Sequence, residues 1–140
     1  MSLLNTLDEA VANVARQPAV NALLALSARV LLSLMFIVAG YNKIGGFEGT
    51  AGYMESMGVP GSLLPLVILL ELGGGLALLI GLQARLVALA LAVFCVVSAF
   101  IFHGGSDQMQ QILFMKNLTM AGGFLLIVRT GAGPLAVDKA

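Results

Sequence analysis

Four long apolar segments separated by short polar connections dominate the chain. They run from about 20 to 41, 62 to 82, 84 to 103 and 111 to 128. Each is close to the roughly 20 residues that an α-helix needs to cross a bilayer. Short connections place consecutive helices antiparallel. The pattern therefore predicts an all-α membrane protein, an antiparallel bundle of four transmembrane helices.

The polar N-terminal segment carries apolar residues at helical spacing: Leu3, Leu4, Leu7, Val11 and Val14. This pattern is typical of an amphipathic helix that lies at the membrane interface. The chain thus divides into an interfacial N-terminal segment (1–18), a transmembrane domain (19–130) and a cytoplasmic tail with no fold of its own (131–140).

The connection after the first span is long and rich in glycine, and it predicts a short interfacial helix from Thr50 to Met57 that ends at Gly58. The connection after the second span is a tight turn, and the one after the third is polar. Basic residues gather on one side of the predicted membrane: Arg16, Arg85, Arg129 and Lys139, against Lys43 alone on the other. Both termini are therefore predicted to be cytoplasmic by the positive-inside rule.

Composition supports lipid as the environment. Hydrophobic residues make up 59% of the chain and charged residues only 10%, whereas soluble domains carry about 25% charged residues. The formal net charge is zero, so no basic field is present to attract nucleic acid. Methionines gather toward the outer side without a cluster of His or Cys, and we expect no metal site.

Three ionisable residues fall inside predicted spans, namely Arg29, Glu71 and Lys116. A charge at the centre of a span costs about 2.5–3.5 kcal/mol on insertion scales, so such residues face inward and pair. Rise per residue puts Arg29 and Glu71 at similar depths, about 12 and 15 Å from the cytoplasmic side. We therefore expect Arg29 and Lys116 to neutralise Glu71, with Ser33 and Asn117 satisfying the remaining hydrogen bonds.

Glycines surround this carboxylate in the sequence. Gly74 and Gly75 follow Glu71 by three and four residues, on the same helical face, and leave room beside it. Gly73, Ala77 and Gly81 form a small-xxx-small pattern that favours close helix packing.

Two interpretations of the charged cluster stay open at this point. A structural salt bridge would fix the helix register, and a polar site would bind a substrate or relay a proton. Three further residues are secondary candidates for the site: Lys43, Tyr53 and His103. A lone His at a helix end is more often a solvent-exposed residue than a group that transfers a proton or contacts a quinone. Cys95 is predicted to be a small buried apolar residue. As the single cysteine of the sequence it cannot form an intrachain disulfide.

With these residues in place, the chain resembles the DoxX family of small bacterial inner-membrane proteins, and within it the YqjF-like group. The resemblance covers residues 29–138 and is carried by the segments RVLLSLMFIVAGYNKIGGFEGTAGYMESMGVPG, LPLVILLELGGGLALLIGLQAR, FIFHGG and LFMKNLTMAGGFLLIVRTGAGPLAVD. The family is named for a relative of a subunit of an archaeal thiosulfate:quinone oxidoreductase. The resemblance implies an inner-membrane location and a redox-linked role with a quinone as the ligand.

No cofactor is evident from the residues themselves, because the chain has no CxxC, no haem-ligand pair and no flavin motif. It carries no self-contained catalytic motif, so whether it is an enzyme stays open. The first hypothesis is a quinone-related membrane component, a subunit of an oxidoreductase. The alternatives are a non-enzymatic scaffold that recruits a membrane or peripheral protein partner or forms a homo-oligomer, and a transporter for a small solute or proton.

Overall fold

The computed structural model describes residues 2–139. Its helical elements are α1 (Leu3–Ala15), α2 (Pro18–Gly45), α3 (Phe47–Ser56), η1 (Gly61–Leu63), α4 (Leu64–Ile68), η2 (Leu69–Gly73), α5 (Gly74–Ile80), α6 (Ala84–Phe102) and α7 (Gln108–Thr130). The elements η1 to α5 join end to end. Together with α2, α6 and α7 they give four helices long and apolar enough to cross a membrane. The predicted all-α fold with four spans is confirmed.

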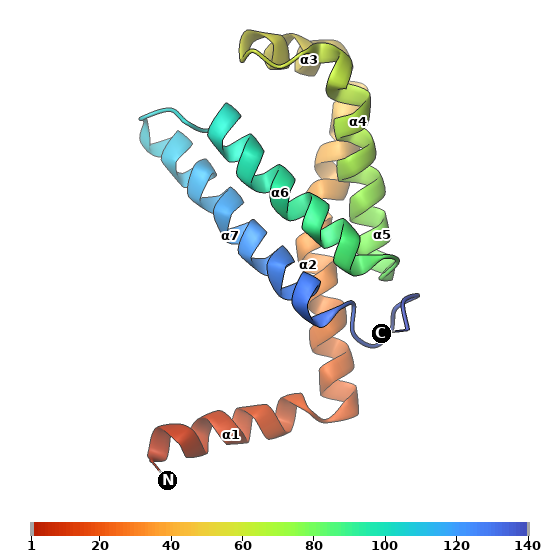
Figure 1. The fold of residues 1–140 in the computed structure, drawn as a ribbon, viewed down its shortest axis with the longest axis vertical. Coiled ribbons are helices and arrows are strands. Elements are labelled where there is room, and N and C mark those ends of the chain that lie inside the picture. The colour runs from red at the N-terminus through yellow and green to blue at the C-terminus, as the bar shows by residue number, and fades with distance from the viewer. Residues whose placement is uncertain (1, 140) are drawn as a thin grey trace.

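The four spans form two antiparallel hairpins that cross at an angle (Figure 1). One hairpin pairs α2 with the α4–η2–α5 rod, and the other pairs α6 with α7 along their length. The two hairpins meet where α6 packs on α5, whereas the contact between α2 and α7 is small. The helices therefore spread apart toward the end that carries α3.

Close backbone approach sets the register of the first hairpin. A Cβ added at Gly40 would lie 2.7 Å from the backbone nitrogen of Leu72, and one at Gly75 would lie 2.8 Å from Cγ1 of Ile37. Small residues at these positions let α2 and the rod approach each other. The contact falls on Gly75 and not on the predicted Gly73–Ala77–Gly81 pattern. A Cβ at Gly73 would meet only Leu69 of the same rod, and Gly81 ends α5 with φ +74°.

This register gives a direct test. We expect Gly40→Ala to lower the free energy of unfolding by about 1–3 kcal/mol, since the new methyl group meets the backbone of Leu72. Gly122→Ala in α7 is the matched control, because a Cβ there meets nothing within 4 Å. The control should be neutral or slightly stabilising, as Ala favours helix over Gly. Thermal unfolding of both variants in detergent measures the difference, and equal melting temperatures would contradict the assigned contact.

Small side chains line the face of α6 that packs against its neighbours. Ala84, Ala88, Leu91 and Cys95 recur at helical spacing and are almost fully buried. On α7, Phe124 is fully buried and packs edge-on against Phe36 of α2, with ring centroids 5.4 Å apart. This core lies at the crossing of the two hairpins and holds them together.

The outer surface of the spans is strongly apolar. Leu31, Leu69 and Phe100 expose about two thirds or more of their surface, at 73%, 67% and 67%. Contiguous apolar surface of this kind is unstable in water, and a lipid bilayer covers it.

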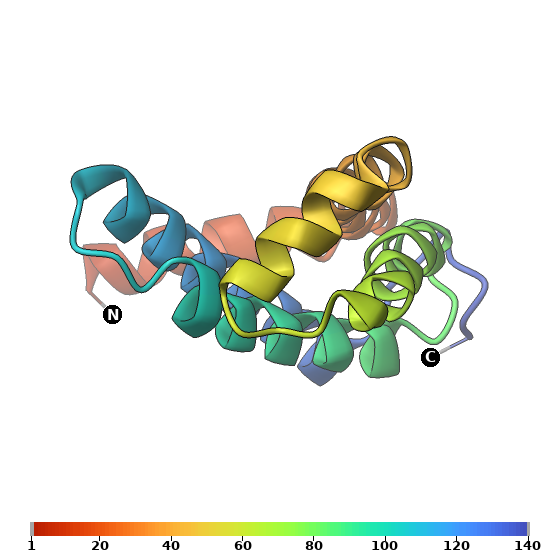
Figure 2. The same cartoon turned by 90° about the horizontal axis from the view of Figure 1, so that it is seen from above.

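Two helices lie outside the spans. Helix α3 runs across the end of the bundle from α2 toward α6, as the view from above shows (Figure 2). A short helix was predicted in this connection from Thr50 to Met57, and the observed one spans Phe47–Ser56. Helix α1 lies across the other end of α2 (Figure 1), and the side chains of Leu3, Leu4 and Val11 are exposed. Its placement at a membrane interface stays a prediction.

The C-terminal segment 131–139 forms no helix or strand of its own, but it is hydrogen-bonded to the bundle. The amides of Val137 and Asp138 donate to the carbonyls of Ile80 and Gly81, at 3.0 and 2.9 Å. The carboxylate of Asp138 accepts from the amides of Gln83 and Ala84, both at 2.8 Å. These amides belong to the unpaired first turn of α6, so the tail satisfies a helix terminus that the sequence leaves open.

Arg29 fastens this segment to the bundle. Its guanidinium donates to the carbonyl of Leu79 at 2.6 Å, of Pro134 at 3.1 Å and of Leu135 at 2.7 Å. The side chain is 1% exposed. One buried cation therefore joins α2, the end of α5 and the C-terminal segment.

Candidate functional site

The predicted pairing of Arg29 with Glu71 is wrong. In this antiparallel hairpin Gly40 lies against Leu72 and Ile37 against Gly75, so Glu71 is level with position 41. That level is roughly 18 Å further along α2 than Arg29. The prediction assumed that both helices begin at one depth, whereas α2 extends well beyond the α5–α6 turn (Figure 1).

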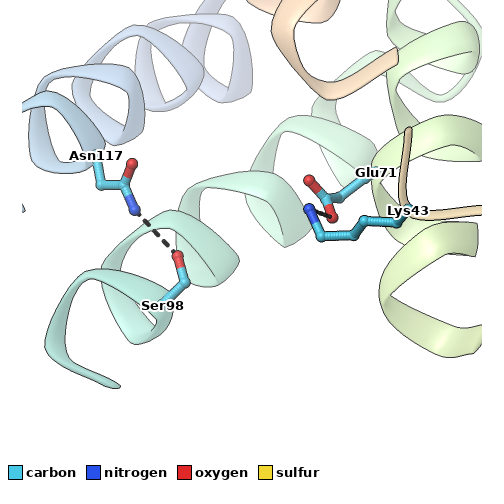
Figure 3. A network of polar contacts seen from close by, with 4 residues as sticks. All are labelled: Lys43, Glu71, Ser98 and Asn117. Atoms are coloured by element: carbon cyan, nitrogen blue, oxygen red, sulfur yellow. Dashed lines mark hydrogen bonds and ion pairs between the residues drawn. The ribbon is translucent and has the colours of Figure 1, made fainter. Parts of the chain in front are cut away.

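Lys43 is the partner of Glu71. Its Nζ lies 2.8 Å from Oε1 of Glu71, and the lysine side chain is 29% exposed while the glutamate is 4% exposed (Figure 3). This contact is an ion pair by distance, although Oε1 makes no hydrogen bond of good geometry to any described residue. Phe36, Gly40 and Lys43 share one face of α2, the face that carries the contact of Gly40 with the rod. From the sequence alone, Lys43 was only a secondary candidate.

A π-helical turn presents the carboxylate. Residues Leu69–Gly73 form η2, with Glu71 at its centre. A π turn holds an extra residue and changes the direction of the side chains that follow, and such turns are frequent at functional sites. The spacing rule that placed Gly74 and Gly75 beside Glu71 assumed an uninterrupted α-helix. In the structure, a Cβ added at Gly74 would lie against Val87 and Leu91 of α6 instead.

A cavity of about 250 Å³ lies between the two hairpins, beneath α3. Glu71, Lys43, Lys116 and Asn117 line it. Its apolar wall consists of methionine, phenylalanine and other side chains from α2, α3, α4, α6 and α7: Met35, Phe36, Ala39, Met54, Val67, Phe94, Phe102 and Met120. The cavity brings together most of the predicted site residues and excludes Arg29 and Ser33.

On the α7 wall, Asn117 is 7% exposed and its Nδ2 donates to Oγ of Ser98 on α6 at 3.1 Å (Figure 3). Ser98 in turn donates to the carbonyl of Cys95 at 3.2 Å. Lys116, half-buried beside Asn117, lines the same cavity. Sequence reasoning did not assign Ser98 or Cys95 to this wall, because a small residue inside an apolar run carries no polar signal.

The secondary candidates Tyr53 and His103 lie at the rim near α3. Tyr53 stacks on Phe102 of α6 with ring centroids 5.6 Å apart, and both line the cavity. His103 also lines it, and its Nδ1 is 3.0 Å from Oε1 of Gln110. Ser33 is buried elsewhere and donates to the carbonyl of Val30 in its own helix, so it serves packing near Gly75.

No group of three His, Cys, Asp or Glu side chains that could hold a metal occurs within residues 2–139. What the cavity offers is one carboxylate, two ammonium groups, an amide, hydroxyl groups and an imidazole around an apolar and aromatic space. A few convergent polar groups in such a space are typical of a ligand site.

Comparison with known proteins places this arrangement in a family. The DoxX family model matches residues 24–104, a segment that contains most of α2, the whole α4–η2–α5 rod, all of α6 and both members of the Lys43–Glu71 pair. The chain belongs to the DoxX family. It is 52% identical over 115 residues to the inner membrane protein YqjF of Escherichia coli, covering 81% of this chain and 88% of that protein.

Two further relatives share a lower sequence identity with this chain. The inner membrane protein YphA of Escherichia coli is 33% identical over 124 residues, 83% of this chain and 89% of that protein. A Bacillus subtilis protein named "Putative oxidoreductase CatD" is 34% identical over 65 residues, 46% of this chain and 48% of that protein. No solved structure matches this DoxX-family chain.

Proposed function

We propose that this DoxX-family protein is a redox-linked component of the bacterial inner membrane whose cavity binds the head group of a membrane quinone. The observation that carries the proposal is the cavity itself, which combines aromatic side chains with the donors of Lys116 and Asn117 inside a membrane-spanning bundle. A quinone head needs both features, a flat apolar ring contact and hydrogen-bond donors for its carbonyl oxygens.

The size and position of the cavity support a ligand with a hydrocarbon tail. Drug-sized ligands occupy pockets of about 300–1,000 Å³, so about 250 Å³ suits a ring and leaves no room for a long tail. Met35 lines the cavity and is also 43% exposed on the lipid-facing side of α2. A tail would therefore leave past Met35 into the bilayer.

The residues have distinct roles in this proposal. Lys116 and Asn117 would donate to one carbonyl oxygen, Phe36 and Phe94 would contact the ring, and the Lys43–Glu71 pair would hold the hairpin and balance charge. The bound quinone would accept or supply the electrons. The electron partner would be another protein, in line with the oxidoreductase in the name of the relative CatD.

Location and orientation belong to the same proposal. Two relatives are named inner membrane proteins, and an even number of spans returns both termini to one side of a membrane. Arg16 follows α1, Arg85 lies in the first turn of α6 and Arg129 in the last turn of α7, and these helix ends lie at the end of the bundle that holds the termini (Figure 1). The positive-inside rule then places that end in the cytoplasm, with α3 and the mouth of the cavity toward the outer side.

Photolabelling tests the proposed ligand. An azido derivative of a short-chain ubiquinone is added to the protein in lipid nanodiscs, and labelled peptides are mapped by mass spectrometry. We expect labelling of the cavity wall and at least a tenfold loss in Ala39→Phe, since Ala39 lines the cavity. Ala28→Phe is the matched control, because Ala28 is an exposed residue of the same helix. Equal labelling of both variants, or labels only outside the cavity, would refute quinone binding here and favour the scaffold.

A further inference from the structure

The charges that line the cavity do not cancel. Lys43, Glu71 and Lys116 are the formally charged side chains on its wall, two positive and one negative, and the imidazole of His103 also lines it. Lys43 and Glu71 form an ion pair at 2.8 Å. Among residues 2–139 the ion pair found is Lys43–Glu71, so Lys116 has no carboxylate partner there. One positive charge is therefore left in excess inside the cavity, on the α7 wall.

The neighbours of Lys116 do not satisfy it either. The Nδ2 of Asn117 donates to Ser98, and the hydroxyl of Ser98 donates to the carbonyl of Cys95. This chain of hydrogen bonds is complete without the ammonium of Lys116. Its donors are therefore available to a molecule in the cavity.

An ammonium without a counter-charge at membrane depth is costly, and the cost is relieved by a nearby negative charge. A neutral carbonyl relieves less of it than an ionised oxygen, because charge-assisted hydrogen bonds between two ions are stronger. Since Lys43 and Glu71 already balance each other, one negative charge is enough. A second would meet the carboxylate of Glu71.

From this balance we infer that the cavity selects the monoanionic form of its ligand, a ring with one ionised oxygen placed against Lys116. The inference rests on the proposed function, because it names the form of the quinone-like ligand that the same site prefers. In this inference Lys116 is the residue that discriminates between an anionic and a neutral ligand, while Lys43 and Glu71 do not.

Two naphthoquinones of similar size separate charge from shape. 2-Hydroxy-1,4-naphthoquinone is an anion at neutral pH, and 2-methyl-1,4-naphthoquinone is neutral. Both are used as competitors against the photolabel in nanodiscs at pH 7.5. We expect the anion to compete at a concentration at least tenfold lower in the natural protein. In Lys116→Met the preference should fall to about twofold or less, chiefly through weaker binding of the anion.

Two further variants make the result specific. Arg129→Met removes a cation from the same helix outside the cavity and should keep the preference. Lys116→Arg keeps the positive charge and should keep most of the preference for the anion. Gel filtration and the melting temperature of each variant show whether it is folded before binding is compared.

Each outcome has a defined meaning. Equal competition by the two compounds in the natural protein overturns the charge inference and leaves quinone binding intact. A preference for the anion that persists in Lys116→Met also overturns the charge inference, because a group other than Lys116 would then discriminate between the two compounds. If neither compound competes and the photolabel itself does not bind, the proposed function and the inference fall together.

Discussion

Replacing Arg29 with methionine is expected to destabilise the protein by on the order of 3 kcal/mol. The substitution leaves the carbonyls of Leu79, Pro134 and Leu135 without their donor, and a buried polar group that loses its partner costs about 1–3 kcal/mol. The two tail carbonyls recover part of this by reaching solvent. For a chain of this length the change corresponds to a fall of roughly 10 °C in melting temperature.

Arg85→Met is the matched control. Arg85 also donates to two backbone carbonyls, those of Val128 and Arg129 at 2.7 Å each, but it lies exposed at the start of α6. Its loss should cost less than about 1 kcal/mol. The buried Cys95 is the one cysteine of the chain, so a thiol-reactive dye reports unfolding of both variants. Equal melting temperatures would show that Arg29 does not hold the bundle together.

The release of the tail can be measured separately. Amide hydrogen exchange at Val137 and Asp138 reports their hydrogen bonds to Ile80 and Gly81. We expect exchange there to accelerate at least tenfold in Arg29→Met under conditions in which the spans stay folded. Unchanged protection would mean that Asp138 alone fixes the segment.

Removing Glu71 is expected to be the second large effect. Glu71→Gln leaves Lys43 and Lys116 as two uncompensated cations facing one cavity. Breaking a buried ion pair costs about 3–5 kcal/mol, and the partial exposure of Lys43 reduces this to roughly 2 kcal/mol. Lys43→Met should cost less, because the Glu71 carboxylate then still faces the positive charge of Lys116 across the cavity.

The double variant decides whether the two residues act as a pair. Lys43→Met with Glu71→Gln removes both charges, and we expect it to recover at least about 1 kcal/mol relative to the sum of the single effects, as measured by a double-mutant cycle. Additive losses would show that the ion pair is not energetically coupled. Arg29→Met combined with Glu71→Gln serves as the comparison, and these two effects should add because Arg29 contacts other groups.

Part of the candidate site followed from the sequence. An ionisable residue inside an apolar run faces protein and not lipid. This rule selected Glu71 and Lys116, and both line one cavity together with Asn117, the neighbour of Lys116. The rule names no partner. Pairing Glu71 with Arg29 required a common starting depth for two helices, and the packing of Gly40 on Leu72 sets a different one. No local pattern in the sequence reports that register.

Hydropathy alone determined that this chain crosses a membrane four times, because the transfer of a helix into lipid depends on the residues within that helix. The tertiary structure decided which groups meet. The crossing of the hairpins and the docking of the C-terminal segment are contacts between segments far apart in the chain, and the π turn at Leu69–Gly73 lies where the rod packs on α2. Because of these contacts, Glu71 pairs with Lys43 and Arg29 lies outside the site. The depth of each residue depends on how its helix packs against the next.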